Sequence, residues 1–247
     1  MKWQHEYQKY YDFHPEIVEN YSLFTVGVLS KIQSYKIPII SLDKAIPKEA
    51  VCQVFENVNT GGVSLSVFEL VTATFAADDF ELRKDWEKKR EILRKHLVLK
   101  NVTATDFLTS MTLLTGYKRY KLIGQAVSCK KKDVLNLKIE DYKHYSDDLV
   151  QGFIYASKFL QEQRIFSERD LPYSTQLIPM AAIFTLLSSK VHDSTVKNKL
   201  ARWYWCGVLG EMYGGANETR YALDVTGIMA WIEEGSSEPD TINRAYF

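Results

Sequence analysis

The organisation of this chain depends on the stretch Val54-Phe55-Glu56-Asn57-Val58-Asn59-Thr60-Gly61-Gly62-Val63-Ser64-Leu65-Ser66-Val67-Phe68-Glu69-Leu70. It has the pattern of a helix end, a polar glycine turn and the start of a second helix. Glycines at positions 61 and 62 tolerate positive φ and leave their N–H groups accessible. We therefore expect a tightly defined corner at residues 59–62.

The start of the second helix is marked by two spacings. Ser66 and Glu69 have the spacing of a capping box, and Leu65 and Leu70 have the spacing of a hydrophobic staple. These spacings predict a helix from Ser66 to about residue 77.

Composition excludes several classes of protein. The 31 basic residues equal the 31 acidic ones, so no overall field indicates nucleic acid or an acidic membrane. Three widely spaced cysteines, without CxxC or Cys/His pairs, favour a reducing, cytoplasmic setting with no zinc site. The longest apolar run, 177–187, is too short to span a bilayer, so we expect no membrane insertion.

Hydrophobic periodicity predicts a mainly α, multi-helix, bundle-like domain. One β-branched run with an internal proline, residues 36–40, predicts a small β element. The charged segment 79–98 predicts a solvated helix with i,i+4 ion pairs, and 174–189, apolar all round, predicts a central helix. The other expected helices span about 3–13, 15–35, 47–57, 103–117, 139–166, 194–212 and 217–234.

A basic segment without acidic residues precedes Asp133. Such a segment is either a flexible surface loop or a loop that contacts phosphates, and the sequence alone favours the flexible loop. The residues that would bind DNA in the second interpretation are Lys118, Arg119, Lys121, Lys130, Lys131 and Lys132.

An aromatic run, Arg202-Trp203-Tyr204-Trp205, lies in the helix expected at 194–212. It could form a cation–π or stacking surface, but the simpler interpretation is a core Trp203 and an Arg202 paired with an acid. Asp224 and Arg220, four residues apart on the last helix, could pair with each other.

The Asn59-Thr60-Gly61-Gly62 turn is the strongest candidate ligand site. A turn at a helix N-terminus can bind a phosphate through free N–H groups and the helix dipole. Corners of this composition are also common for structural reasons, and local physics alone favours that interpretation. The chain lacks the GxxxxGK[ST], GxGxxG, HExxH and GxSxG motifs, and its histidines are scattered, so no catalytic residue or metal site is predicted.

The run Ile37-Pro38-Ile39-Ile40 and the stretch 54–65 resemble the FxxxNTxGxxL region of the GmrS-like N-terminal domain family. That family occurs in GmrSD-type restriction endonucleases and prokaryotic phage-defence proteins. Leu171-Pro172-Tyr173, the aromatic run and the segment from Tyr213 through Thr219 to Asp224 are similar to its helical half.

The resemblance implies a ParB/sulfiredoxin-like α/β part with an Asp-Gly-Gln-Gln-Arg nucleotide motif, a helical part and an HNH-type nuclease module. This sequence contains no Asp-Gly-Gln-Gln-Arg. We therefore expect a piece that lacks the front of the α/β part: residues 1–65 as its remnant and 66–247 as the helical domain.

The resemblance also implies a function. Asn59, Thr60, Gly61 and Gly62 would bind a nucleoside triphosphate in the complete domain, whereas Arg202, Trp203 and Asp224 match family positions without an assigned role. We expect a regulatory part, inactive as an enzyme by itself, that contributes to nucleotide-dependent sensing of modified DNA and acts with a nuclease module. The alternative is a helical protein–protein interaction module with no ligand.

Overall fold

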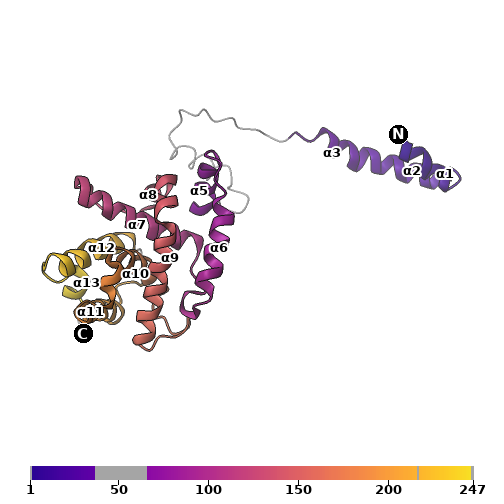
Figure 1. Ribbon diagram of the computed structural model, residues 1–247. Helices are drawn as coiled ribbons and strands as arrows, with labels where there is room; N and C mark the ends of the chain where they lie inside the picture. Colours follow the sequence, from indigo (N-terminus) through magenta and orange to yellow (C-terminus); the bar gives the residue numbers. More distant parts are fainter. Residues whose placement is uncertain (1, 37–65, 216, 246–247) are drawn as a thin grey trace. The chain divides into compact units, whose positions relative to one another are not determined.

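The computed structural model describes residues 2–36, 66–215 and 217–245 (Figure 1). The chain divides into two compact units, Met1–Ala45 and Ile46–Phe247. The described residues form helices and no strand, which confirms the predicted mainly α, multi-helix class. Four predictions concern residues that lie outside the described ranges or at their edge. They are the β element at 36–40, the helix at 47–57, the turn at 59–62 and the domain boundary after residue 65.

The first unit is a hairpin of two helical arms. After α1 (Lys2–Tyr10), a turn leads into a continuous arm made of α2 (Pro15–Phe24), a π-helical stretch (Thr25–Leu29) and α3 (Ser30–Ser34). Pro15 occupies the first turn of α2, where its missing N–H costs nothing. The two arms match the helices predicted at about 3–13 and 15–35.

The second unit contains the remaining described helices. α5 starts as predicted, because Ser66 Oγ accepts from Glu69 N at 3.3 Å and Ser66 N donates to Glu69 Oε2 at 2.6 Å. The bounds are α5 (Val67–Ala76), α6 (Leu82–Arg94), α7 (Ala104–Ile123), α8 (Lys131–Leu135), α9 (Ile139–Glu162), α10 (Leu177–Leu187), α11 (Ser194–Leu209), α12 (Glu218–Glu233) and α13 (Asp240–Asn243), with short 3-10 turns at Leu97–Leu99, Ser174–Gln176 and Ser188–His192.

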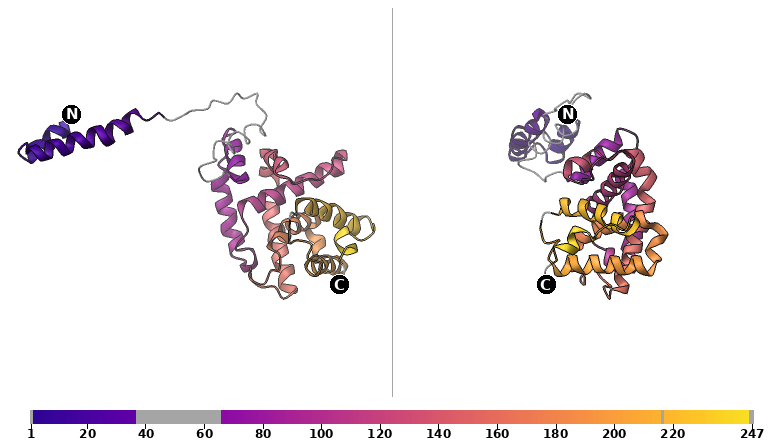
Figure 2. Two further views of the ribbon diagram at one scale, coloured as in Figure 1. Left: turned by 180° about the vertical axis from the view of Figure 1, so that it is seen from behind. Right: turned by 90° about the vertical axis from the view of Figure 1, so that its left-hand side faces the viewer.

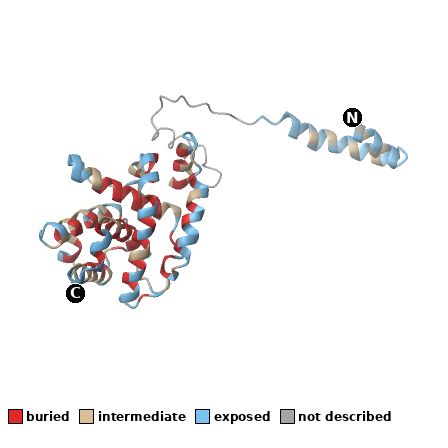
Figure 3. Ribbon diagram, viewed as in Figure 1, coloured by how far each residue is buried: buried red, intermediate tan, exposed pale blue. Residues whose placement is uncertain are grey.

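The core of the second unit is built around α10. This helix packs against α9, α7 and α12, and nearly all its residues are buried (Figures 1 and 3). The all-round hydrophobic pattern thus indicated its central place correctly. Pro179 lies in its first turn, where proline is tolerated. Gly152 of α9 lets the two helices approach, since a Cβ there would lie 2.6 Å from the Ala181 carbonyl oxygen. Figure 2 shows the same unit from behind and from one side.

Several predicted helix limits were wrong. α7 continues to Ile123 and ends at Gly124 with φ 71°, whereas the pattern predicted an end near Tyr117. α11 ends at Leu209, before the expected limit of 212, and is capped by Asp193, whose carboxylate accepts from two backbone N–H groups. Beyond the last expected helix, at 217–234, the chain forms a further short helix, α13. No helix in the described ranges is long and apolar enough to cross a bilayer.

Candidate functional site

A pocket of about 320 Å³ lies where several helices begin, and we call it the helix-end pocket. Its wall includes the first residue of α5, the first turns of α7 and α12, and the start of α8. The lining residues are Val67, Thr105, Asp106, Thr109, Cys129, Lys131, Val134, Thr175, Ile178, Gly215, Asn217, Glu218 and Tyr221. The predicted nucleotide residues 59–62 lie outside the described residues, and Val67 is the sixth residue along the chain counting from Gly62.

The helix-end pocket combines helix N-termini, which attract anions, with two acidic side chains and one lysine. The N-termini of α5, α7 and α12 carry partial positive charge and backbone N–H groups without helical partners. The two acids partly cancel this positive field. Asp106, in the first turn of α7, accepts from the N–H of the N-cap residue Thr103 at 2.9 Å, and Glu218 stands in the first turn of α12.

Cys129 does not make this pocket a nucleophilic site. Its side chain is buried, and its Sγ donates to the Glu218 carbonyl oxygen at 3.4 Å. Burial raises the pKa of the Cys129 thiol to about 12, so the thiol stays protonated near neutral pH. The Cys129 thiol is therefore not poised as a thiolate nucleophile.

The predicted basic segment is largely helical. Lys118, Arg119 and Lys121 occupy the last turns of α7, where the flexible-loop interpretation placed a loop. The Arg119 guanidinium lies 3.0 Å from Asp141, and Lys121 Nζ lies 2.7 Å from Glu234. The Lys118 ammonium lies over the Tyr145 ring, 4.7 Å from its centroid. These side chains hold α7 to its neighbours.

The other three lysines surround the start of α8. Lys130 is its N-cap residue, and Lys131 and Lys132 are its first two residues. Lys130 and Lys131 line two different cavities: Lys131 the helix-end pocket, and Lys130 a separate groove. Their role in DNA binding stays a prediction.

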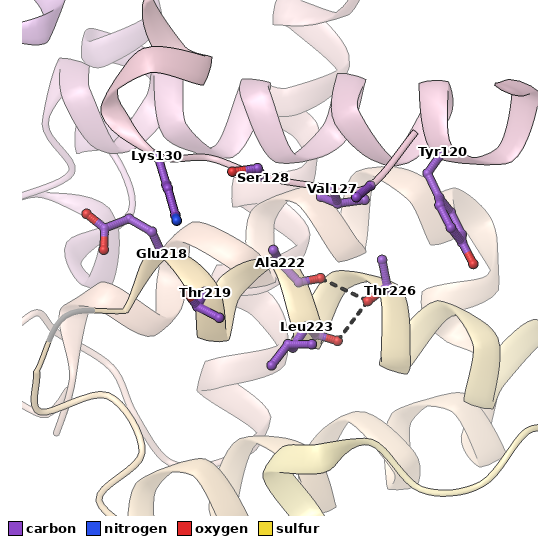
Figure 4. A pocket seen from close by; sticks show the side chains of 10 residues that line it. Tyr120, Val127, Ser128, Lys130, Glu218, Thr219, Ala222, Leu223 and Thr226 are labelled. Carbon is purple, nitrogen blue, oxygen red and sulfur yellow. Dashed lines mark hydrogen bonds between the residues drawn. The ribbon is translucent and has the colours of Figure 1, made fainter. Parts of the chain in front are cut away.

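That separate groove, the α7–α12 groove, has a volume of about 420 Å³ (Figure 4). One side is α12, and the other is the connection between α7 and α8. Its lining is mainly apolar, with Lys130 and Glu218 at one end and Tyr120 at the other (Figure 4). No sequence pattern indicated it, because its two sides lie almost a hundred residues apart.

The aromatic run belongs to the core and its edge. Trp203 is fully buried, and the Arg202 guanidinium forms a two-point ion pair with Glu238, with Nη2 3.0 Å from Oε2. Trp205 Nε1 donates to Gln163 Oε1 at 3.0 Å. The interpretation as a core residue and an ion pair is confirmed.

Asp224 is the centre of a buried polar network. It accepts hydrogen bonds from the Tyr213 hydroxyl and, at 2.5 Å, from Thr241 Oγ1. Burial raises the pKa of the Asp224 carboxyl to about 6. Arg220 forms its ion pair with Asp240 at 2.9 Å, so the pairing of Arg220 with Asp224 considered from their spacing is not formed. The sequence did contain a signal, since Asp224 shares a helical face with apolar residues.

A second polar cluster was missed on α6. Lys89 is only 7% exposed, although its charged surroundings predicted a solvated face. Its Nζ lies 2.6 Å from Asp147 and 3.3 Å from Asp85, and the Tyr142 hydroxyl donates to Asp85 at 2.7 Å. Burial, followed by the bond to Asp85, raises the pKa of the Tyr142 hydroxyl. This cluster joins α6 to α9. Within the described ranges, no three His, Cys, Asp or Glu side chains gather as metal ligands would.

Comparison with known proteins gives one distant relative. The chain is 25% identical over 249 residues to an uncharacterized protein of Methanocaldococcus jannaschii. The aligned region covers 96% of this chain and 39% of the relative, so the chain spans about two fifths of that protein's length. No family model matches the chain. No solved structure matches it significantly.

Proposed function

We propose that this chain is the helical, regulatory part of a GmrS-like domain in a DNA-restriction or phage-defence protein of the prokaryotic cytoplasm. In this proposal it contributes to nucleotide-dependent sensing of modified DNA and acts with a nuclease module. The observation that carries the proposal is the helix-end pocket, whose lining includes Val67, the first residue of α5.

The position of the motif along the chain supports a shared nucleotide site. Gly62 and Val67 are five residues apart, a length of chain that spans at most ~18 Å. Helix N-termini bind phosphates through their N–H groups and dipoles, and three of them meet at this pocket. A triphosphate that contacts Asn59, Thr60, Gly61 and Gly62 would therefore find further donors within reach.

The comparison with the longer relative supports a role as part of a larger protein. The aligned region makes up 39% of that relative. In our proposal, a nucleotide-hydrolysing motif and a nuclease module belong to other parts of a longer protein. The proposed task of this part is to transmit the effect of nucleotide binding, and it hydrolyses no nucleotide by itself.

Calorimetric titration with ATP and with GTP tests the nucleotide proposal, on this chain and on a form extended upstream. We expect heat from the extended form, lost in Asn59→Ala and weakened in Lys131→Ala. Lys132→Ala, an exposed neighbour in α8, serves as the matched control. No heat from the extended form, or heat unchanged by Asn59→Ala, contradicts the proposal.

DNA contact by the basic segment is tested by binding curves with modified duplex DNA over a salt series. Phosphate contacts give a logarithmic slope of about −0.9 per contact, which Lys130→Ala and Lys132→Ala should each reduce. A flat salt dependence excludes phosphate contacts. Arg119→Ala is a poor probe, because it also breaks the ion pair with Asp141.

A helical interaction module without ligand is the second candidate, and one observation favours it. No residue from Trp3 to Lys36 is buried, and Trp3, Tyr10 and Tyr35 are 61%, 80% and 74% exposed. A helical hairpin without a core of its own gains stability by packing against another surface. Protein capture that depends on Trp3 and Tyr35, with no nucleotide binding, would support this candidate.

A further inference from the structure

The first unit has one arm that is much longer than the other. α1 has 9 residues, whereas α2, the π-helical stretch and α3, which together we call the long arm, follow one another with 10, 5 and 5. At about 1.5 Å per residue, the two lengths are about 14 Å and about 30 Å. The ring centroids of Trp3, the second residue of α1, and Tyr21 lie 6.0 Å apart. α1 therefore begins beside Tyr21, and no helix among residues 2–36 covers the long arm beyond that point.

This uncovered half of the long arm is apolar. Among residues 23–35, Lys31 is the one charged residue. Figure 3 shows no buried position in the described part of the unit. Because a helix of this length is marginal in water by itself, apolar side chains exposed along it indicate a surface that packs against another. The exposed large apolar side chains are Leu23, Phe24, Val26, Val28, Ile32 and Tyr35, and four of them are between 65% and 74% exposed.

The π-helical stretch sets some of these side chains in a straight row. In an α-helix, side chains four residues apart drift around the axis, because one turn holds 3.6 residues. Here Ser30 N donates to Thr25 O, five residues back, so the turn is wider and reverses that drift. Phe24, Val28 and Ile32 therefore lie on one line along the long arm, and we call this line the arm seam.

The charges of the long arm are divided between its two ends. Glu16 and Glu19 lie near its start, and residues 15–30 include no basic side chain. Lys31 and Lys36 lie in its last turn and just after it, and residues 20–36 include no acidic side chain. None of the four forms an ion pair with a residue in the described ranges. Two identical arms side by side therefore attract each other at both ends when antiparallel, and repel each other at both ends when parallel.

We propose that the protein forms a two-fold symmetric dimer in which the long arms of two copies pair antiparallel along the arm seam. The long arm is complementary to itself, which is what an interface between identical chains requires. With Phe24 level with Val28 of the other copy, Ile17 comes level with Tyr35, and the acidic start of each arm meets the basic end of the other. Together with the two α1 helices, the paired arms build a small helix bundle. This inference rests on the hairpin and does not depend on nucleotide binding.

Sedimentation equilibrium of the full chain tests the dimer itself. We expect a dimer at about 50 μM protein that dissociates to monomer on dilution. A monomer at every concentration up to about 200 μM overturns the proposal.

Two valines of the π-helical stretch test the arm seam. Val28→Asp should raise the dissociation constant of the dimer more than about tenfold, because it buries a charge in the seam. Val26→Asp is the matched control: Val26 lies off the seam and is 68% exposed, so the constant should change about twofold or less. Loss of helix would affect both variants alike. Equal effects of the two variants, or a dimer that Val28→Asp leaves intact, overturn the proposal.

Charge reversal tests the antiparallel orientation. One variant carries Glu16→Lys with Glu19→Lys, and the other carries Lys31→Glu with Lys36→Glu. Each variant alone should dimerise about tenfold more weakly than wild type at low ionic strength, because both ends of its arm then carry the same charge. An equimolar mixture should recover the wild-type affinity as a mixed dimer. In a parallel dimer, like charges meet before and after reversal, so unchanged affinity of the separate variants contradicts the proposed orientation.

Discussion

Replacement of Asp224 by asparagine isolates the titration of a buried carboxyl. Asp224 is 1% exposed and accepts from the Tyr213 and Thr241 hydroxyls. Burial raises the pKa of its carboxyl from 3.8 to about 6. Asparagine has a similar size but does not titrate. The difference in unfolding free energy between wild type and Asp224→Asn therefore cancels the titration of all other groups.

The expected magnitude follows from proton linkage. A raised folded-state pKa means that the native state holds this proton more tightly than the unfolded chain. Its contribution to stability is complete below 3.8 and is lost as the pH rises through about 6. The interval between the unfolded-state and folded-state pKa values, at about 1.36 kcal/mol per pH unit, corresponds to a stabilisation of about 3 kcal/mol. About 2 kcal/mol of this falls between pH 4.5 and 8.

Urea unfolding followed by tryptophan fluorescence at several pH values measures this difference. We expect the stability of wild type relative to Asp224→Asn to fall by about 2 kcal/mol from pH 4.5 to pH 8. Asp148→Asn, the loss of an exposed carboxylate on α9, serves as the control. A difference that is constant, or that increases with pH, refutes the reasoning.

Three further outcomes follow from the described contacts. Lys89→Ala should lower the free energy of unfolding by about 2 kcal/mol, because it leaves Asp85 without its cation, while exposed Lys88→Ala should cost less than ~0.5 kcal/mol in urea unfolding. Gly152→Ala should destabilise by ~2 kcal/mol or more in thermal unfolding, because its Cβ would collide with α10, whereas Gly215→Ala meets open space; equal costs would contradict this packing. Cys129 should stay unmodified by iodoacetamide at pH 8 in peptide mass spectrometry, and rapid labelling would contradict its burial.

The sequence predicted the features that depend on neighbouring residues. The Ser66–Glu69 capping box and the all-round apolar pattern of α10 each report a local or one-helix property, and both were confirmed. The end of α7 was misplaced because Lys118 and Arg119 resembled the start of a loop. Their contacts with Tyr145 and Asp141 instead extend the helix.

Features that join distant segments were not predictable from spacing. The Asp224 network needs Thr241, and the Lys89 cluster needs Asp147 on another helix. The α7–α12 groove exists only because α12 lies beside the connection that contains Val127. Pairings between segments far apart along the chain are set by tertiary packing, which helical periodicity does not encode.

Amide chemical shifts during an ATP titration test the proposed nucleotide site most directly. The form extended upstream is used, with this chain as the comparison. The account predicts that the largest shifts occur at the first-turn amides of α5, α7 and α12, around Val67, Thr105 and Glu218. Shifts confined to the α7–α12 groove around Val127, or no shifts in the extended form, would contradict it.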